Sequence, residues 1–420
     1  MDVVSILLGI SVILFLGFIA EFIFQKMSIP DVLILMIIGF VIGPYALGYV
    51  APSQIQSFAP IFTTFALLFL MYEGAFDISL ESLAKGAAKS LQITILNFIL
   101  CVIITSGIMY LFGYDILTSV LVGFVLSSIS AAFVIPILKQ LNVTGETFSM
   151  LTLESALTDV LSIVFAFTVM QLMEVHILNF QTVFSQIASI FAVAGVIGII
   201  AGLIWIVLVI KVFQDRKSYM ITIAYLVMIY VITEYLNGNG AIAALFFGLV
   251  LKNSKLIVQV LSKLFYSGDD KEKRASKYAI DAISPDEEFF YSQISFLLKT
   301  FFFVYIGILI NLSDTNALMI GAIIAIAIMI ARQSNRLITK KLSGFDQKVV
   351  RSTYARGIAS AAVAQVIILK NIPKASELVD IIFAVIIFTI FLSSINVFSI
   401  KRSKDKGFKE EKTKKAQATT

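Results

Sequence analysis

Apolar runs of about 20 residues recur along the whole chain, and this feature constrains the fold more than any other. Only 14% of the 420 residues are charged and the mean hydropathy is +0.96, whereas soluble domains carry about 25% charged residues. Because a run of this length crosses a bilayer as a helix, the sequence predicts an all-α polytopic membrane protein with about 13 transmembrane helices. The predicted spans are 3–24, 30–50, 59–76, 90–112, 116–138, 149–172, 185–210, 219–236, 240–260, 290–311, 316–338, 352–370 and 378–400.

The remaining composition excludes several classes of protein. A single cysteine (Cys101) and a single histidine (His176) cannot supply a disulfide framework, a zinc cluster or a haem ligand pair. No Gly-Lys dipeptide occurs, so the sequence has no phosphate-binding P-loop, and we expect transport to draw on an ion gradient. We predict no enzyme activity, no catalytic residue and no cofactor. We also predict no nucleic-acid partner, because the net charge of +5 comes from basic residues in loops and in the tail.

The distribution of basic residues predicts the orientation. With 13 spans and a cytoplasmic C-terminus, all but five of the 32 Lys and Arg residues face the cytoplasm. Of those five, Lys370 and Lys374 lie outside, and Lys299, Arg332 and Arg356 lie within spans. We therefore expect a multi-pass protein of the cell membrane with its N-terminus outside and its C-terminus in the cytoplasm.

The spans suggest two repeats within one transmembrane domain over residues 1–400. We expect a first repeat over about 3–172, a linker helix over about 185–210 and a second repeat over about 219–400, by position alone. A charged loop at about 265–289 is expected to be partly helical. The short basic tail, 401–420, is expected to be disordered, and its lysines could contact anionic membrane lipid.

The sixth predicted span carries two carboxylates, Glu154 and Asp159, within LTLESALTDV. Ionisable groups at bilayer depth are costly and are functional candidates by default. Ser155 and Asp159 are four residues apart on one helix face, and Glu154 and Thr158 share the neighbouring face. Stacked oxygen-bearing side chains suit a small hard cation, while the structural alternative is a buried carboxylate that serves packing.

Three further charged residues within predicted spans are candidates for the site or its support. Glu73, in the third span, is either part of the site or a carboxylate that reaches the membrane surface. Arg332, in the eleventh span, needs a counter-charge at depth, and Glu154 is the natural partner. Arg356, at the start of the twelfth span, is either an interfacial anchor or a clamp on a helix break.

The fifth and twelfth spans are unusually rich in small residues. The fifth contains Ser128 and Ser130 within LSSISAAF, and the twelfth contains Gly357 within ARGIASAA. Small residues let helices approach closely, which is one sufficient explanation. The other explanation is that these spans are interrupted, because paired interrupted helices mark the ion site in transporters built from inverted repeats.

Motifs along nearly the whole chain resemble those of the monovalent cation:proton antiporters, and most closely the NhaP/NHE-type sodium–proton exchangers. The matching stretches are LLFLMYEGAFDISLESL in the third span, LTLESALTDVLSIV in the sixth, GNGAIAALFFGLVLKN in the ninth, TFFFVYIGILI in the tenth, and the Arg332 and Arg356-Gly357 positions. The resemblance implies two inverted six-helix repeats, a core and a dimerisation domain, fifth and twelfth helices that are discontinuous and cross, and a homodimer.

The resemblance also implies roles for individual residues. Asp159 would bind the cation and the proton, and Ser155 and Glu73 would be further Na+ ligands. Glu154 and Arg332 would form a structural ion pair beside the site. Support for the helix breaks would come from Ser128, Ser130, Arg356 and Gly357.

Two positions depart from the NhaP/NHE pattern. The fifth span has Ile129, Ser130 and Ala131 where that branch has Thr-Asp-Pro, and its SSISAA run is closer to the Kef/NapA-like branch. Ile129 could then offer only its backbone carbonyl to the ion. Thr158 stands where the exchangers have Asn and the electrogenic branch has a second Asp.

These observations predict a secondary active antiporter that exchanges Na+ or Li+ for H+. One carboxylate, Asp159, binds either a cation or a proton, so transport is expected to be electroneutral. The nearest alternative is a K+/H+ antiporter on the same scaffold. A gated cation channel or efflux pathway is an alternative of a different class.

Overall fold

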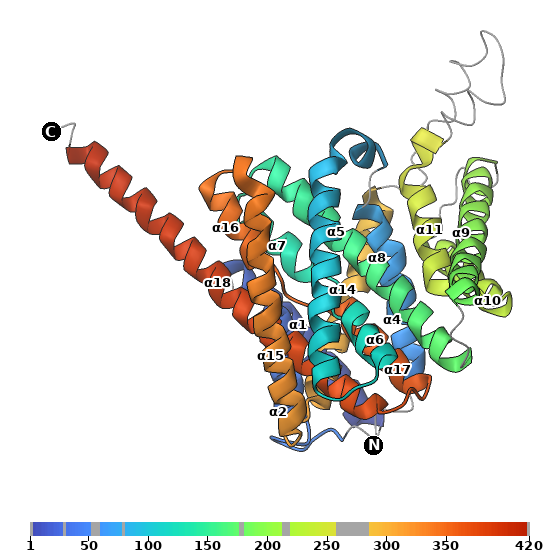
Figure 1. The fold of residues 1–420 in the computed structure, drawn as a ribbon. Coiled ribbons are helices and arrows are strands. Elements are labelled where there is room, and N and C mark those ends of the chain that lie inside the picture. The colour runs from blue at the N-terminus through green and yellow to red at the C-terminus, as the bar shows by residue number, and fades with distance from the viewer. Residues whose placement is uncertain are drawn as a thin grey trace, which may run out of the picture. The chain divides into compact units, whose positions relative to one another are not determined.

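The computed structural model of the chain describes residues 3–27, 31–51, 59–77, 80–175, 180–211, 219–257 and 285–417, and every regular element in these ranges is helical. The α-helices are α1 (Val3–Met27), α2 (Asp31–Ile42), α4 (Ala59–Gly74), α5 (Leu80–Leu111), α6 (Ile116–Val125), α7 (Ala131–Leu141), α8 (Gly145–Val175), α9 (Phe180–Lys211), α10 (Tyr219–Tyr235), α11 (Gly240–Lys252), α14 (Pro285–Leu309), α15 (Thr315–Ala331), α16 (Gly344–Ser352), α17 (Ile358–Leu369) and α18 (Ala375–Gln417) (Figure 1). Short 3-10 helices are η1 (Ala75–Asp77), η2 (Arg332–Leu337) and η3 (Thr339–Lys341).

The apolar helices coincide with the predicted spans. Among the described residues, six helices are long and apolar enough to cross a membrane, and eight apolar helices are shorter. Each predicted span contains at least one of these helices, and the fifth contains two, α6 and α7. The all-α prediction is therefore confirmed for the described part of the chain.

The chain divides into two compact units. Unit 1 consists of Met1–Ala59, Ala88–Val169 and Thr300–Thr420, and unit 2 of Pro60–Ala87 and Met170–Lys299. These units are not the two predicted repeats, because unit 1 takes helices from both halves of the sequence. Contacts between the fifth and twelfth spans, described below, join those halves.

Within unit 1, α18 is the central packing element. It contacts α15, α16 and α17, and also α2 and α6. Its inner residues are almost fully buried and aliphatic, such as Ile382, Val385 and Ile386. Burial of this stripe holds the discontinuous helices of the unit against one long continuous helix.

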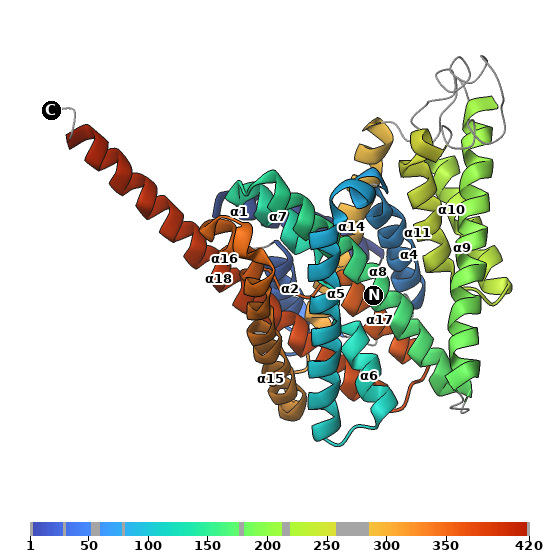
Figure 2. The same ribbon diagram turned by 45° about the horizontal axis from the view of Figure 1, so that its top comes forward.

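Within unit 2, α9, α10 and α11 pack side by side (Figure 2). Aromatic side chains fill the space beside them. Tyr72 stacks on Phe247 with ring centroids 5.6 Å apart, and Tyr291 meets Tyr72 edge to face at 5.4 Å. Such offset and edge contacts are the favoured aromatic geometries and make this a rigid cluster.

Two helices of unit 1 are interrupted where the sequence is rich in small residues. The helix of the fifth span stops at Val125 and resumes at Ala131, and that of the twelfth stops at Ser352 and resumes at Ile358. The predicted discontinuity of both spans is present. The twelfth span was predicted to begin at 352, but the structure places all of α16 before the break. Its charged residues, including Lys348 and Arg351, concealed this helix from a search for apolar runs.

The tail was predicted to be disordered, and in the structure α18 continues as one helix to Gln417. The tail is rich in Lys, which is a good helix former, and it follows an existing helix, so no new nucleation is needed. Most of the loop predicted at 265–289 lies outside the described residues. Its last residues, from Pro285, begin α14.

Candidate functional site

Helix α8 carries the four polar residues of the predicted sixth-span site. Glu154, Ser155 and Thr158 are fully buried, and Asp159 is half-buried with its Oδ1 atom enclosed by protein. Because the helix is continuous from Gly145 to Val175, the one-turn spacing of Ser155 and Asp159 is retained.

The two helix breaks of unit 1 are bonded directly to each other. The backbone N–H of Ser130 donates to the carbonyl of Ala355 at 2.9 Å. Ser360 donates to the carbonyl of Val125 at 2.7 Å, and its hydroxyl lies 3.0 Å from that of Ser128. Backbone groups released by the breaks would be costly inside a membrane, and these bonds satisfy several of them.

Arg356 clamps the first break. Its Nη1 atom donates to the carbonyl of Ser128 at 2.6 Å and lies 3.4 Å from that of Ser127, and Nη2 lies 3.2 Å from the sulfur of Cys101. Its backbone N–H donates to Thr389 at 3.1 Å. The side chain is buried, so the interfacial-anchor alternative for Arg356 is wrong.

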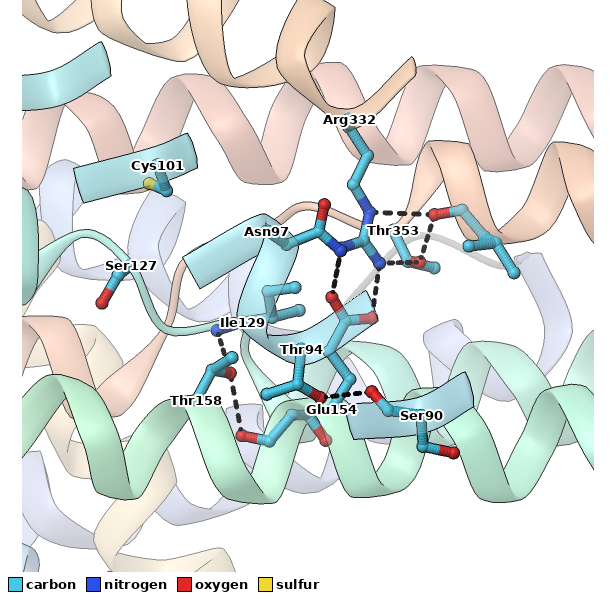
Figure 3. Close-up of polar contacts among 12 residues, drawn as sticks. Ser90, Thr94, Asn97, Cys101, Ser127, Ile129, Glu154, Thr158, Arg332 and Thr353 are labelled. Carbon is cyan, nitrogen blue, oxygen red and sulfur yellow. Dashed lines mark hydrogen bonds and ion pairs between the residues drawn. The ribbon is translucent and has the colours of Figure 1, made fainter. Parts of the chain in front are cut away.

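Thr158 ties the first break to α8. The N–H of Ile129 donates to the Thr158 hydroxyl at 3.1 Å, and that hydroxyl donates to the carbonyl of Ser155 at 3.1 Å (Figure 3). A hydroxyl has one proton and two lone pairs, so one lone pair of Thr158 remains for an ion. This bond uses the N–H of Ile129, and the predicted role of its carbonyl as an ion ligand stays a prediction.

The Ser155 hydroxyl donates to the carbonyl of Thr152 at 2.9 Å, within its own helix. This arrangement uses the proton and leaves both lone pairs of the hydroxyl for a cation. Ser162, one turn beyond Thr158, donates to the carbonyls of Phe124 and Val125 at 2.7 and 3.2 Å. The break is therefore held against α8 both at Thr158 and at Ser162.

Glu154 and Arg332 form a buried ion pair. Nη2 of Arg332 lies 2.8 Å from Oε2 of Glu154, and Nη1 contacts Oε1 (Figure 3). Nε of Arg332 donates to the carbonyl of Val350 at 2.9 Å, just before the second break. The two-pronged contact matches the fork geometry that guanidinium and carboxylate groups favour.

Asn97 is part of this cluster and was missed in the sequence. Its amide donates to Oε1 of Glu154 at 2.6 Å. Ser90, Thr94, Asn97 and Cys101 recur at helical spacing along α5 and form one polar stripe (Figure 3). This spacing of polar residues within an apolar run is the pattern that could have identified Asn97.

Glu73 belongs to unit 2 and is described within that unit. It is half-buried near the end of α4, and its Oε2 atom accepts a hydrogen bond from the hydroxyl of Ser295 on α14. Ser295 was not predicted, because a single serine in an apolar run carries little information on its own.

The geometry of unit 1 suits reversible binding of a small cation or a proton. A half-buried carboxylate, Asp159, stands one turn from a hydroxyl with two open lone pairs, beside a helix break that is held by hydrogen bonds. Carboxylate and hydroxyl oxygens are the ligands that hard cations favour. Of the two carboxylates in the segment 151–160, Glu154 is already neutralised by Arg332, which leaves Asp159 to bind a cation or a proton.

Comparison with known proteins agrees with this fold. The family described as "Sodium/hydrogen exchanger, transmembrane" matches residues 10–401, so the chain belongs to that family of multi-pass membrane proteins. Na+/H+ antiporter 1 of Methanocaldococcus jannaschii is 24% identical over 389 residues, which is 87% of this chain and 84% of that protein.

Another relative is named as a K+/H+ antiporter. NhaP of Alkalimonas amylolytica is 22% identical over 254 residues, which is 60% of this chain but only 44% of that protein. The solved structure of the sodium proton antiporter MjNhaP1 from M. jannaschii at pH 8 superposes with a TM-score of 0.75 and 21% identity. The superposition covers 95% of this chain and 97% of the MjNhaP1 chain, so this chain has the fold of that antiporter.

Proposed function

We propose that this protein is a secondary active antiporter that exchanges Na+ or Li+ for H+ across the cell membrane. The observation that carries the proposal is the placement of Asp159, one turn from Ser155 and beside Thr158, whose hydroxyl holds the break of the fifth span. The family assignment and the named Na+/H+ antiporter among its relatives support the same activity.

The proposed mechanism is competition for one carboxylate. Ionised Asp159 binds the cation, with Ser155, Thr158 and the backbone near Ile129, all of unit 1, as further candidate ligands. Asp159 then returns across the membrane in its protonated form, without a cation. An isolated ionised carboxylate is costly to bury, so the site moves across the membrane only when a cation or a proton neutralises it. The role of Glu73 as a cation ligand rests on the family resemblance alone.

This mechanism exchanges one cation for one proton and is therefore electroneutral. Glu154 does not add a second site, because Arg332 contacts both of its carboxylate oxygens. Thr158 has no ionisable group that could carry a second proton. We further propose inverted repeats, a homodimer and a cytoplasmic C-terminus, which the family resemblance and the distribution of basic residues support.

K+/H+ exchange at the same site is the second candidate. It is favoured by the relative named as a K+/H+ antiporter, and by the fifth span, which has Ser130 where the exchanger branch has an aspartate. A site without this second carboxylate has a weaker field, and such a site discriminates less against a larger cation.

Transport in proteoliposomes tests the proposal. Purified full-length protein is given an imposed pH gradient, and Na+, Li+ or K+ is added in turn. We expect Na+ and Li+ to collapse the gradient with wild-type protein and not with Asp159→Asn. Glu146→Gln, which removes an exposed carboxylate from the first turn of the same helix, is the matched control and should transport normally.

The remaining outcomes separate the alternatives. Robust exchange by Asp159→Asn would overturn the mechanism. Collapse of the gradient by K+ but not by Na+ would favour the K+/H+ antiporter. Cation flux that leaves the pH gradient intact would indicate a channel.

A further inference from the structure

Helix α5 has two chemically different faces within unit 1. Its polar stripe, which includes Asn97 and Cys101, faces the Glu154–Arg332 pair and Arg356. Residues displaced by about half a turn from that stripe are apolar, since successive residues rotate by about 100° around a helix. Leu91, Ile95 and Ile99 on this side are exposed.

The apolar face of α5 lines a groove of about 690 Å3. Its wall is formed by Leu91, Ile95, Leu96, Ile99 and Leu100, together with Ile338 just beyond η2. Gln92 is the one polar residue in the lining. The helical wall from Leu91 to Leu100 is about 14 Å long at about 1.5 Å per residue, and it begins at the first turn of the apolar stretch Ser90–Leu111.

Basic side chains gather at the Ile338 end of the groove. Arg336, Lys340 and Lys341 all lie within three residues of Ile338, and all are exposed. None of the three forms an ion pair with a described residue.

We propose that this groove binds one anionic glycerophospholipid, with an acyl chain along α5 and the headgroup at Arg336, Lys340 and Lys341. The wall, apolar except for Gln92, fits a hydrocarbon chain better than a polar solute. Each basic residue near an anionic lipid surface contributes about 1 kcal/mol of attraction, so a cluster of three selects an anionic headgroup over a zwitterionic one.

The site lies on the back of the helix that positions Asn97. An acyl chain in the groove supports α5 from the lipid side, while Asn97 donates to Glu154 from the other side. Binding of the lipid is therefore expected to stabilise the folded protein. This inference does not depend on which cation the protein transports.

Native mass spectrometry of the full chain in detergent tests the site. The probes are phosphatidylglycerol and phosphatidylcholine with identical acyl chains, titrated separately, with the thermal midpoint measured in parallel. Arg336→Gln/Lys340→Gln/Lys341→Gln removes the cluster. Lys252→Gln/Lys255→Gln/Arg402→Gln removes three other exposed cations and is the matched control. Leu96→Trp fills the groove.

We expect wild type to bind one phosphatidylglycerol at least tenfold more tightly than phosphatidylcholine and to gain thermal stability from it. The cluster variant should lose this preference while the control keeps it. Leu96→Trp should weaken binding of both lipids. If Leu96→Trp does not fold, the cluster variant still tests the proposal, because its substitutions are on the surface. Equal affinity of wild type for the two lipids, or equal loss in the cluster and control variants, would overturn the proposal.

Discussion

Arg332 contacts both carboxylate oxygens of Glu154, with Nη2 and Oε2 2.8 Å apart, and each side chain is almost completely buried. The pair joins α8 to the segment just before the second helix break, because Nε of Arg332 also donates to Val350. Asn97 adds a third connection from α5. The contacts of the pair thus hold α8, η2, α16 and α5 together.

Removing either member of the pair alone should be strongly destabilising. Glu154→Gln or Arg332→Gln leaves a buried charge without its partner, which costs about 3–5 kcal/mol. The double variant should recover part of this loss, because no buried charge is then uncompensated. Thermal unfolding of the purified variants measures the effect, and the double-mutant cycle gives the coupling energy.

The exposed pair of Lys252 and Glu288, 3.3 Å apart, provides the matched control for this cycle. Its coupling should be only about 0.2–1 kcal/mol, since water screens both charges. Additive effects of Glu154→Gln and Arg332→Gln, with no larger coupling than at the exposed pair, would show that the buried contact does not stabilise the fold.

Gly357 should be intolerant of a side chain, because the two breaks cross at this point. A Cβ atom on Gly357 would lie 2.2 Å from Oγ and 2.4 Å from Cβ of Ser130. Gly357→Ala should therefore lower stability by about 1–3 kcal/mol or prevent folding, as overpacking does elsewhere. Yield of folded protein and the thermal midpoint are the measurements.

Ser130→Gly should rescue Gly357→Ala, since it removes both clashing atoms and leaves the Cα of residue 130 at 3.1 Å. Gly107→Ala is the control for adding a methyl group to a helix of unit 1, because nothing lies within 4 Å of that position. A stable Gly357→Ala protein with wild-type transport would contradict the close crossing.

Asp115 should stabilise α6 through its N-terminal cap. Its carboxylate accepts from the backbone N–H of Thr118 at 3.0 Å and from the Thr118 hydroxyl. Burial raises the pKa of Asp115, but the hydrogen bonds from Thr118 outweigh this effect and lower the pKa below its usual value. At neutral pH, Asp115→Ala should cost about 0.5–2 kcal/mol and Asp115→Asn less, because the amide oxygen still caps the helix.

The pH dependence of this cap follows from the sign of the shift. A carboxylate whose pKa is lower in the folded state stabilises above the unfolded-state value of about 3.9, and the stabilisation is lost as the pH falls through the folded-state value. The difference in thermal midpoint between wild type and Asp115→Asn should therefore shrink below about pH 4. A difference that stays constant from pH 7 to pH 3 would argue against a charged cap.

The spans and the Glu154–Arg332 pair could be predicted from the sequence because each depends on a large local energy. An apolar run of about 20 residues partitions into a membrane on its own, and a guanidinium at depth is costly unless it is paired, so Arg332 favoured a partner such as Glu154. The breaks in the fifth and twelfth spans were also predictable, because their small residues stand at corresponding places in the two halves.

Other contacts depend on how the helices pack and could not be predicted in this way. Asn97, Thr389 and Ser162 are single polar residues in apolar helices, and only the fold decides whether each one faces a break or the lipid. Helix α16 was missed for a different reason. Val349 and Val350 are buried, but the charged residues around them keep the average hydropathy of the segment low.

Ser295 should position the carboxylate of Glu73 within unit 2. The serine hydroxyl donates to Oε2 of Glu73, and this contact holds a flexible side chain in one orientation. This prediction applies if Glu73 is a cation ligand, as the family resemblance implies. Glu73→Gln should then raise the apparent KM for Na+ more than it lowers the maximal rate, because one ligand of several is weakened.

Ser295→Ala should raise the apparent KM about 2–10-fold and leave the maximal rate nearly unchanged, since ordering a freed side chain costs about 0.5–1.5 kcal/mol. Ser295→Thr, which keeps the hydroxyl, should restore the wild-type value. Ser292→Ala is the matched control, because Ser292 lies one turn earlier on α14 and donates to the carbonyl of Phe289. Initial rates of pH-gradient collapse over a range of Na+ concentrations measure both parameters. A wild-type KM in Glu73→Gln would instead support a carboxylate that reaches the membrane surface, and Ser295→Ala should then be silent as well, because its effect acts only through Glu73.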